Sequence, residues 1–180
     1  VGGTLALLEA CKRAGTRYFV LSSSAAVYGV PEGGAIAEDH PTRPLSPYGE
    51  SKLLSERLLA DFEESAGIAH CSLRYFNAAG LDAEDDLSWS QGQRPHLIPT
   101  ILSVARGDRS ALVVNGEDYP TEDGTCVRDF VHVSDLAQGH LRALESLRSG
   151  GPSGAWNLGT GRGASVRRVI EAAARVTGRE

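Results

Sequence analysis

Three polar residues in the first third of the chain have the types and spacing needed to move a proton. Tyr48 and Lys52 are four residues apart, so on a helix their side chains share one face, a turn apart. A lysine ammonium in that position stabilises a tyrosine phenolate, which can then act as a base. Ser24 follows a short apolar run, where its hydroxyl could relay a proton between a substrate alcohol and the phenolate. The competing interpretations are an incidental tyrosine and lysine pair and a serine that only forms a turn.

The elements predicted around these residues indicate an α/β sheet. The patterns predict a helix over 1–14, a buried strand over 18–21, a helix over 47–66 with Ser46 as its N-cap, and a second buried strand over 68–76. Ligands bind at the carboxyl ends of strands in parallel sheets. Three polar clusters follow predicted strands in this chain: residues 22–24, Asn77 and the surroundings of Arg128.

The second half of the chain is predicted to be a smaller, mixed α/β region. The polar stretch 82–94 is the candidate boundary, because the apolar periodicity is lost there. We therefore expect one domain over 1–80 and another over 81–180, with 127–148 as a segment that could pack back onto the first sheet. The later elements predicted are a helix over 97–106, strands over 111–114 and 127–133, a helix ending near 147, a strand over 155–158 and a final helix capped by Ser165.

Composition excludes several classes of protein. A net charge of −5 and a pI near 5.6 over 180 residues provide no positive field for a nucleic acid, so a small-molecule substrate is expected. No apolar run is long enough to span a membrane, and three well-separated cysteines fit reduced thiols, so we expect a cytoplasmic protein. The chain has no methionine and opens inside a helical pattern, which we interpret as part of a longer protein.

Two patterns could be mistaken for binding sites. The glycines over 159–163 follow a strand and precede a helix, but they lack the spacing of a dinucleotide loop and are interpreted as a turn. The carboxylates over 117–123 lack the order of a calcium loop. His40, His70, His132 and His140 have no metal-ligand spacing, so no metal site is predicted.

The residues around the Ser24, Tyr48 and Lys52 set resemble those of extended short-chain dehydrogenase/reductases. The resemblance is carried by FVLSSSAAVYG at 19–29 and SPYGESK at 46–52, and within the family it is greatest to the UDP-glucose 4-epimerases. It implies part of a doubly wound Rossmann-type parallel sheet, with the glycine loop before residue 1, and a mixed substrate domain. It continues through LRYFN at 73–77, HLIP at 96–99, DYPTEDGT at 118–125, VRDFVHV at 127–133 and WNLGTG at 156–161.

Roles for individual residues are implied by this resemblance. Tyr48 would be the base and acid at the sugar 4-hydroxyl, Lys52 would bind the cofactor ribose and favour the phenolate, and Ser24 would relay the proton. Arg128 would pair with the pyrophosphate. His96 stands where some members have asparagine, and Asn115 where an aromatic residue often packs near the uracil. The cofactor-binding set would be Ser22, Ser23, Tyr48, Lys52, Tyr75 and Phe76, and the substrate-binding set Ser24, Tyr48, Asn77, His96, Leu97, Val113, Asn115 and Arg128.

The activity implied is NAD-dependent inversion at C4 of a UDP-hexose, in a full-length homodimer, with the 180-residue part inactive alone. A related sugar-nucleotide 4,6-dehydratase or decarboxylase is one alternative, although such an enzyme needs a carboxylate beside the relay hydroxyl. Here those neighbours are Ala25 and Ala26, which cannot transfer a proton. A non-catalytic dinucleotide sensor is another alternative, but it would have no need for the complete Ser24, Tyr48 and Lys52 set.

Overall fold

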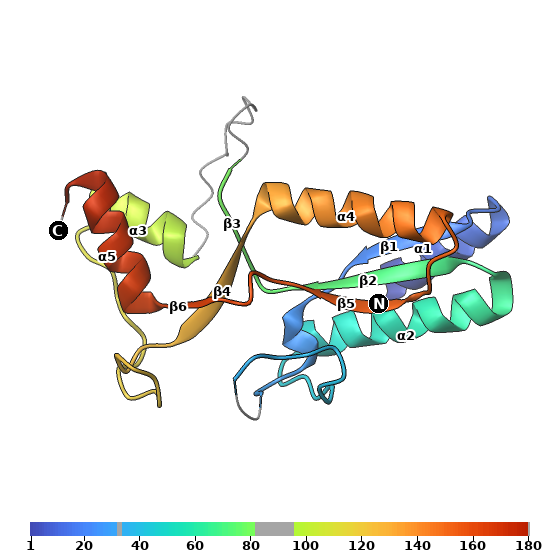
Figure 1. Cartoon of the computed structure of the whole chain (residues 1–180), viewed down its shortest axis with the longest axis horizontal. Helices are drawn as coiled ribbons and strands as arrows, with labels where there is room; N and C mark the ends of the chain where they lie inside the picture. The colour runs from blue at the N-terminus through green and yellow to red at the C-terminus, as the bar shows by residue number, and fades with distance from the viewer. Residues whose placement is uncertain (32–33, 82–95, 180) are drawn as a thin grey trace. The chain divides into compact units, whose positions relative to one another are not determined.

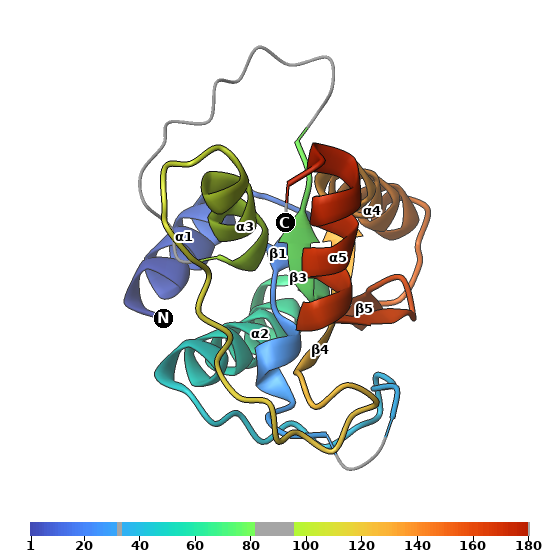
Figure 2. The ribbon, with the colours of Figure 1, turned by 90° about the vertical axis from the view of Figure 1, so that its left-hand side faces the viewer.

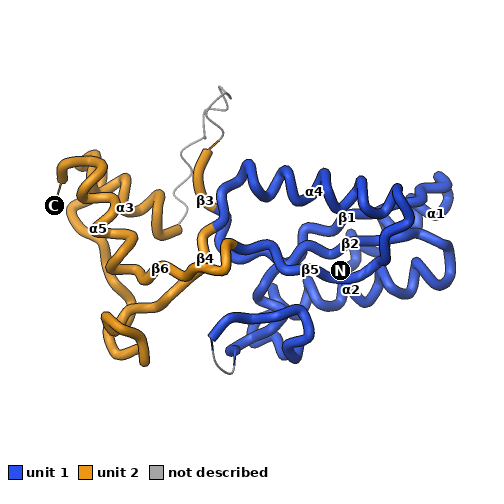
Figure 3. Tube along the Cα trace, in the orientation of Figure 1, with its two compact units in different colours: residues 1–78, 131–159 blue, residues 79–130, 160–180 orange. Residues whose placement is uncertain are grey.

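The computed structural model describes residues 1–31, 34–81 and 96–179, and the chain divides into two compact units (Figure 3). Unit 1 contains residues 1–78 and 131–159, and unit 2 contains 79–130 and 160–180. This grouping differs from a division at residue 80, because the chain returns to the first unit over 131–159. No helix in the described part of the chain is long and apolar enough to span a bilayer.

Unit 1 is built on a parallel sheet of three strands in the order β1-β2-β5 (Figure 1). These strands are β1 Tyr18–Ser22, β2 Ala69–Tyr75 and β5 Gly154–Leu158. The helices are α1 Gly2–Arg13, α2 Pro47–Ala66 and α4 Val133–Arg148, and the short 3-10 helix η1 Ala25–Val27 follows β1. The predicted α/β class and parallel sheet are confirmed.

Alternate side chains of the strands face two different helix layers. Phe19 and Leu21 of β1 pack into a core with residues of α1 and α2, whereas Tyr18 and Val20 pack into a core that includes Leu147 of α4. The central strand β2 is buried along its five middle residues, as expected for a strand covered on both faces. The sheet is therefore enclosed between α1 and α2 on one face and α4 on the other.

Helix α2 begins and ends where the sequence predicts. The Ser46 hydroxyl accepts a hydrogen bond from the Gly49 amide at 3.1 Å, and Pro47 occupies the first turn. At the other end Gly67 adopts a left-handed conformation with φ of 68°, which favours glycine. These local signals fix the position of Tyr48 in the first turn.

Unit 2 pairs α3 Leu97–Ala105 with α5 Val166–Thr177 (Figure 2). The second sheet has the order β3-β4-β6, where β3 is Asn77–Ala79, β4 is Val127–His132 and β6 is Gly163–Ser165. Ser165 caps α5, as predicted, and donates its hydroxyl to Asp123. That bond, with others from Thr125, lowers the pKa of Asp123 to about 2.

One strand predicted in this region is wrong. Residues 111–114 have no regular secondary structure, and Val113 is exposed. The short apolar run is present, but a strand also needs a hydrogen-bonded neighbour, and none pairs with this segment among the described residues. The short elements η1, β3 and β6 were not predicted, since three residues carry no measurable periodicity.

Candidate active site

Ser24 lies at the carboxyl end of β1, where the chain leaves the sheet. Its backbone is extended, and its hydroxyl caps η1 by accepting a hydrogen bond from the Ala26 amide at 3.2 Å. A hydroxyl has two acceptor lone pairs and one donor hydrogen. The capping bond uses one lone pair and leaves the hydrogen available, so Ser24 can both accept a proton and donate one.

Lys52 is held in place by the same strand end. Its Nζ donates to the Ser22 carbonyl oxygen at 2.8 Å and lies 5.7 Å from the centroid of the Tyr48 ring. The side chains of Tyr48 and Lys52 therefore share one face of α2, as the spacing predicts. Tyr48 is 55% exposed, so a ligand can reach its ring. The positive charge of Lys52 therefore lies near the Tyr48 ring.

The first turn of α2 approaches η1 closely because residue 49 has no side chain. A Cβ placed on Gly49 would lie 2.5 Å from the Ala26 carbonyl oxygen and 3.0 Å from Pro44 Cβ. Tyr48 and Lys52 flank this contact on α2, while Ser24 caps η1 on the other side. The structure thus brings the three predicted catalytic residues to one end of the sheet, at β1, η1 and α2.

We expect Gly49→Ala to destabilise the whole protein by about 1–3 kcal/mol, because backbone atoms would have to move to admit the methyl group. Urea unfolding measures this, and turnover should fall as well. Gly3→Ala is the matched control: Gly3 is also helical, and nothing lies within 4 Å of its added Cβ. Equal unfolding midpoints for Gly49→Ala and the parent would show that the close approach is not required.

A second set of residues meets at the ends of β1 and β2. His140 of α4 lies with Nε2 2.8 Å from the Ser22 hydroxyl and Nδ1 2.7 Å from the Leu136 carbonyl oxygen. Because a carbonyl only accepts, Nδ1 donates the hydrogen of that bond. The ring centroids of Tyr75 and His140 are 6.3 Å apart. Ser22, Ser23 and Tyr75, all predicted to bind a cofactor, are therefore at this end of the sheet, with Phe76 and Asn77 next along the chain.

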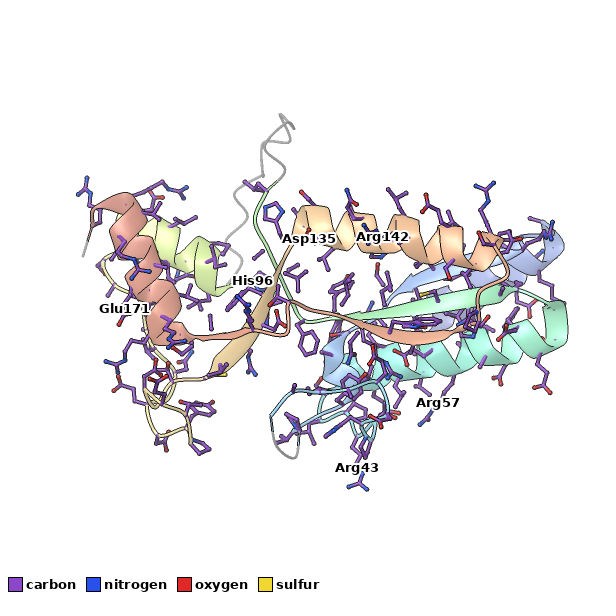
Figure 4. The ribbon with its side chains drawn as sticks, in the orientation of Figure 1. Arg43, Arg57, His96, Asp135, Arg142 and Glu171 are labelled. Atoms are coloured by element: carbon purple, nitrogen blue, oxygen red, sulfur yellow. The ribbon has the colours of Figure 1, made fainter. Side chains whose placement is uncertain are left out.

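The remaining predicted site residues belong to unit 2. His96 is the N-cap of α3, is exposed, and makes no side-chain capping bond (Figure 4). Leu97 begins the helix, and Arg128 is exposed on β4. Val113 and Asn115 lie in the irregular segment after α3, and both are exposed. His96, Val113, Asn115 and Arg128 are thus at the surface of their own unit, whereas Leu97 is half-buried.

The glycine loop 159–163 is a capped turn, as interpreted from the sequence. The Asp129 carboxylate accepts from the Thr160 amide and hydroxyl, at 2.9 and 2.7 Å, and from the Gly161 amide at 2.9 Å. A phosphate would need those donors. Since a carboxylate of the same chain already uses them, the loop is not organised for phosphate binding.

Sequence reasoning missed Glu56, Arg74 and His140 at this end of the sheet. Glu56 follows Lys52 by four residues, so it lies on the same face of α2, and Arg74 interrupts an otherwise uncharged buried strand. A charge in such a strand requires a buried partner. That requirement was the available signal for the Glu56 and Arg74 pair, whereas no local signal distinguishes His140.

A parallel sheet enclosed by helices, with a tyrosine and lysine pair beside the carboxyl end of its first strand, defines a Rossmann-like α/β protein. The chain belongs to the NAD dependent epimerase/dehydratase family, whose model matches residues 1–159. It is 46% identical over 178 residues to a UDP-glucose 4-epimerase of Streptococcus mutans, covering 99% of this chain and 54% of that protein.

Solved structures agree with this membership. A UDP-glucose 4-epimerase from Brucella ovis in complex with NAD has a TM-score of 0.92 and 44% identity, covering 97% of this chain and 54% of its own. The enzyme from Stenotrophomonas maltophila, with bound NAD and formylated UDP-arabinopyranose, has a TM-score of 0.92 and 42% identity, with coverages of 99% and 54%. The chain spans about half the length of the relatives it matches.

Proposed function

We propose that the whole protein interconverts UDP-glucose and UDP-galactose by NAD-dependent epimerisation at C4. The observation that carries the proposal is the position of Lys52, whose Nζ is bonded to the Ser22 carbonyl and lies beside the Tyr48 ring. This arrangement favours a phenolate at the strand end where Ser24 also lies. Relatives named UDP-glucose 4-epimerase, matched over nearly all of this chain, support the same activity.

In this mechanism the protein's own side chains transfer the proton. Tyr48 removes the proton of the sugar 4-hydroxyl, and Ser24 relays it where the oxygens do not meet directly. NAD, when bound beside Lys52, would supply the redox chemistry, since hydride from C4 would pass to it and return to the opposite face of the 4-keto sugar. Tyr48 then returns the proton, so the net reaction is an isomerisation.

Hydrogen-bond donors remain at this end of the sheet that could bind the cofactor. An ammonium has three donor hydrogens, and the Ser22 carbonyl uses one of those on Lys52, which leaves two for ribose hydroxyls. We propose Ser22, Tyr75 and Phe76 as further cofactor contacts. Ser23 was predicted for the same set, but it is fully buried and its hydroxyl bonds to Glu56. For the nucleotide sugar we propose Asn77, His96, Leu97, Val113, Asn115 and Arg128. We propose functional domains over 1–80 and 81–180, with 127–148 as a segment that packs back onto the first sheet.

We further propose a cytoplasmic homodimer with a role in galactose metabolism. Cys11, Cys71 and Cys126 are all free thiols, which is the state that a reducing compartment maintains. Burial raises the pKa of the Cys71 thiol to about 11, so this cysteine stays protonated and unreactive near neutral pH.

A sugar-nucleotide dehydratase is the alternative closest in chemistry. Its route from the same 4-keto sugar requires a carboxylate beside the relay hydroxyl, and Ala25 and Ala26 occupy those positions in η1. The 4-keto sugar has therefore no group in η1 that could remove a further proton. This favours epimerisation.

The whole protein should convert UDP-galactose to UDP-glucose without releasing a 4-keto-6-deoxy sugar nucleotide. A dehydrogenase specific for UDP-glucose reports the conversion, and mass spectrometry of the product mixture tests for the dehydrated species. Equilibration of the two UDP-hexoses at constant mass supports the proposal. Loss of one water from the sugar would instead assign the protein to the dehydratases.

A further inference from the structure

A buried ion pair lies directly behind the proposed catalytic residues. Glu56 of α2 and Arg74 of β2 are each only 8% exposed. Arg74 Nε lies 3.1 Å from Glu56 Oε1, and Nη2 lies 2.6 Å from Oε2, so the two groups form a two-pronged contact. Burial by itself lowers the pKa of Arg74, but the bonds to Glu56 and Tyr28 outweigh it and raise that pKa.

Hydrogen bonds connect the pair to Ser23, which follows β1, and to Tyr28, which follows η1. Ser23, which is fully buried, donates its hydroxyl to Glu56 Oε1. On the other side Arg74 Nη1 donates to the Tyr28 hydroxyl at 2.9 Å, and that hydroxyl donates to Asn157 Oδ1 at 2.7 Å. The Arg74 guanidinium carbon also lies 4.9 Å from the centroid of the Tyr28 ring. These bonds link α2, β1, β2, β5 and the segment after η1.

Two residues one turn apart on α2 thus hold two successive residues of the strand end. Lys52 binds the carbonyl of Ser22, and Glu56 binds the hydroxyl of Ser23. The next residue is Ser24, the proposed relay. A shift of α2 along β1 would break both bonds, so together they fix the first turn of α2, which carries Tyr48, relative to Ser24.

We propose that Glu56 and Arg74 are positioning residues, which set the place of Ser24 relative to Tyr48 through Ser23, alongside the bond from Lys52 to Ser22. The proposal rests on the epimerase function proposed above. A buried ion pair adds little to stability compared with apolar residues of similar volume. Apolar residues, however, cannot accept the hydroxyl of Ser23, so only a polar partner can add this second bond between α2 and the strand end.

The first test compares Glu56→Gln with Glu63→Gln in the whole protein. Glu63 is the matched control, since it lies on the same helix and accepts a serine hydroxyl, that of Ser153, away from the strand end. Glu56→Gln should lower kcat by about 10- to 100-fold, because small displacements of reacting groups have effects of this size. KM for UDP-galactose should stay within about twofold, and the control should resemble the parent.

The kinetic isotope effect separates positioning from loss of folded enzyme. With deuterium at sugar C4, a mispositioned base makes hydride transfer slower, so the isotope effect on kcat should increase in Glu56→Gln. Partial unfolding reduces the amount of active enzyme and leaves both the isotope effect and KM unchanged. A lower kcat with the isotope effect of the parent would therefore overturn the proposal.

The double variant Glu56→Met/Arg74→Met covers the case in which a single change unfolds the protein. It removes both charges at similar volume, so the thermal midpoint should be close to that of the parent. Its kcat should nevertheless stay at least about tenfold lower with a raised isotope effect. Recovery of kcat together with stability would show that the pair is only structural.

Amide hydrogen exchange tests the same proposal without turnover. In Glu56→Met/Arg74→Met the amides of residues 23–27 should exchange at least about tenfold faster than in the parent, because methionine cannot accept the Ser23 hydroxyl and the strand end loses one of its two bonds to α2. Unchanged exchange there would overturn the positioning role. An inactive parent would refute the epimerase function alone, since the exchange comparison still decides the role of Glu56.

Discussion

Tyr48→Phe should lower kcat by about 10²- to 10⁴-fold, the range that a positioned general acid and base contributes. The ring is 55% exposed and its replacement keeps the same shape, so folding and binding of UDP-galactose should be unaffected. Only the phenol oxygen, which is the proposed proton acceptor, is lost. Mixing the variant with UDP-galactose and following the absorbance of reduced nicotinamide measures the step directly.

Tyr119→Phe is the matched control for this experiment. Tyr119 is similarly exposed, at 46%, and it belongs to none of the proposed binding or catalytic sets. Its variant should keep the activity of the parent. Reduction of the bound cofactor by Tyr48→Phe at a rate near that of the parent would mean that another group removes the proton.

Helix and strand ends in unit 1 could be predicted because their signals are local. The start of α2 follows from the Ser46 cap and Pro47, and its end from Gly67, whose left-handed conformation suits glycine. Strand β1 follows from an apolar run that stops at a polar cluster. The segment 111–114 carries an equally good local signal but has no partner strand among the described residues, so its prediction was wrong.

The arrangement of the site could also be predicted only in part, because local patterns do not reveal contacts between distant residues. The four-residue spacing is enough to place Tyr48 and Lys52 on one face of α2. It does not indicate that Lys52 binds the Ser22 carbonyl, because this depends on how closely α2 approaches η1 at Gly49. The Ser23 bond to Glu56 likewise connects residues 33 positions apart, and sequence periodicity carries no information about such contacts.

Lys52→Met should lower kcat by about 10²- to 10³-fold, the loss typical when one preorganised donor to a developing oxyanion is removed. Methionine replaces the unbranched apolar stem but removes the charge beside the Tyr48 ring and the bond to Ser22. Lys52→Arg should restore little, since a planar guanidinium cannot reproduce both contacts of a compact ammonium. Steady-state kinetics with saturating UDP-galactose and added NAD measure both variants.

Lys12→Met supplies the control, because Lys12 is the other lysine of the chain and lies exposed near the end of α1, outside the proposed site. It should behave as the parent. The role of Lys52 divides into two parts, holding the cofactor ribose and favouring the phenolate, and the concentration of NAD separates them. If a large excess of NAD restored kcat in Lys52→Met, the ammonium would serve only to retain the cofactor. If the loss of kcat persists when NAD is saturating, the ammonium of Lys52 acts in the proton transfer at Tyr48.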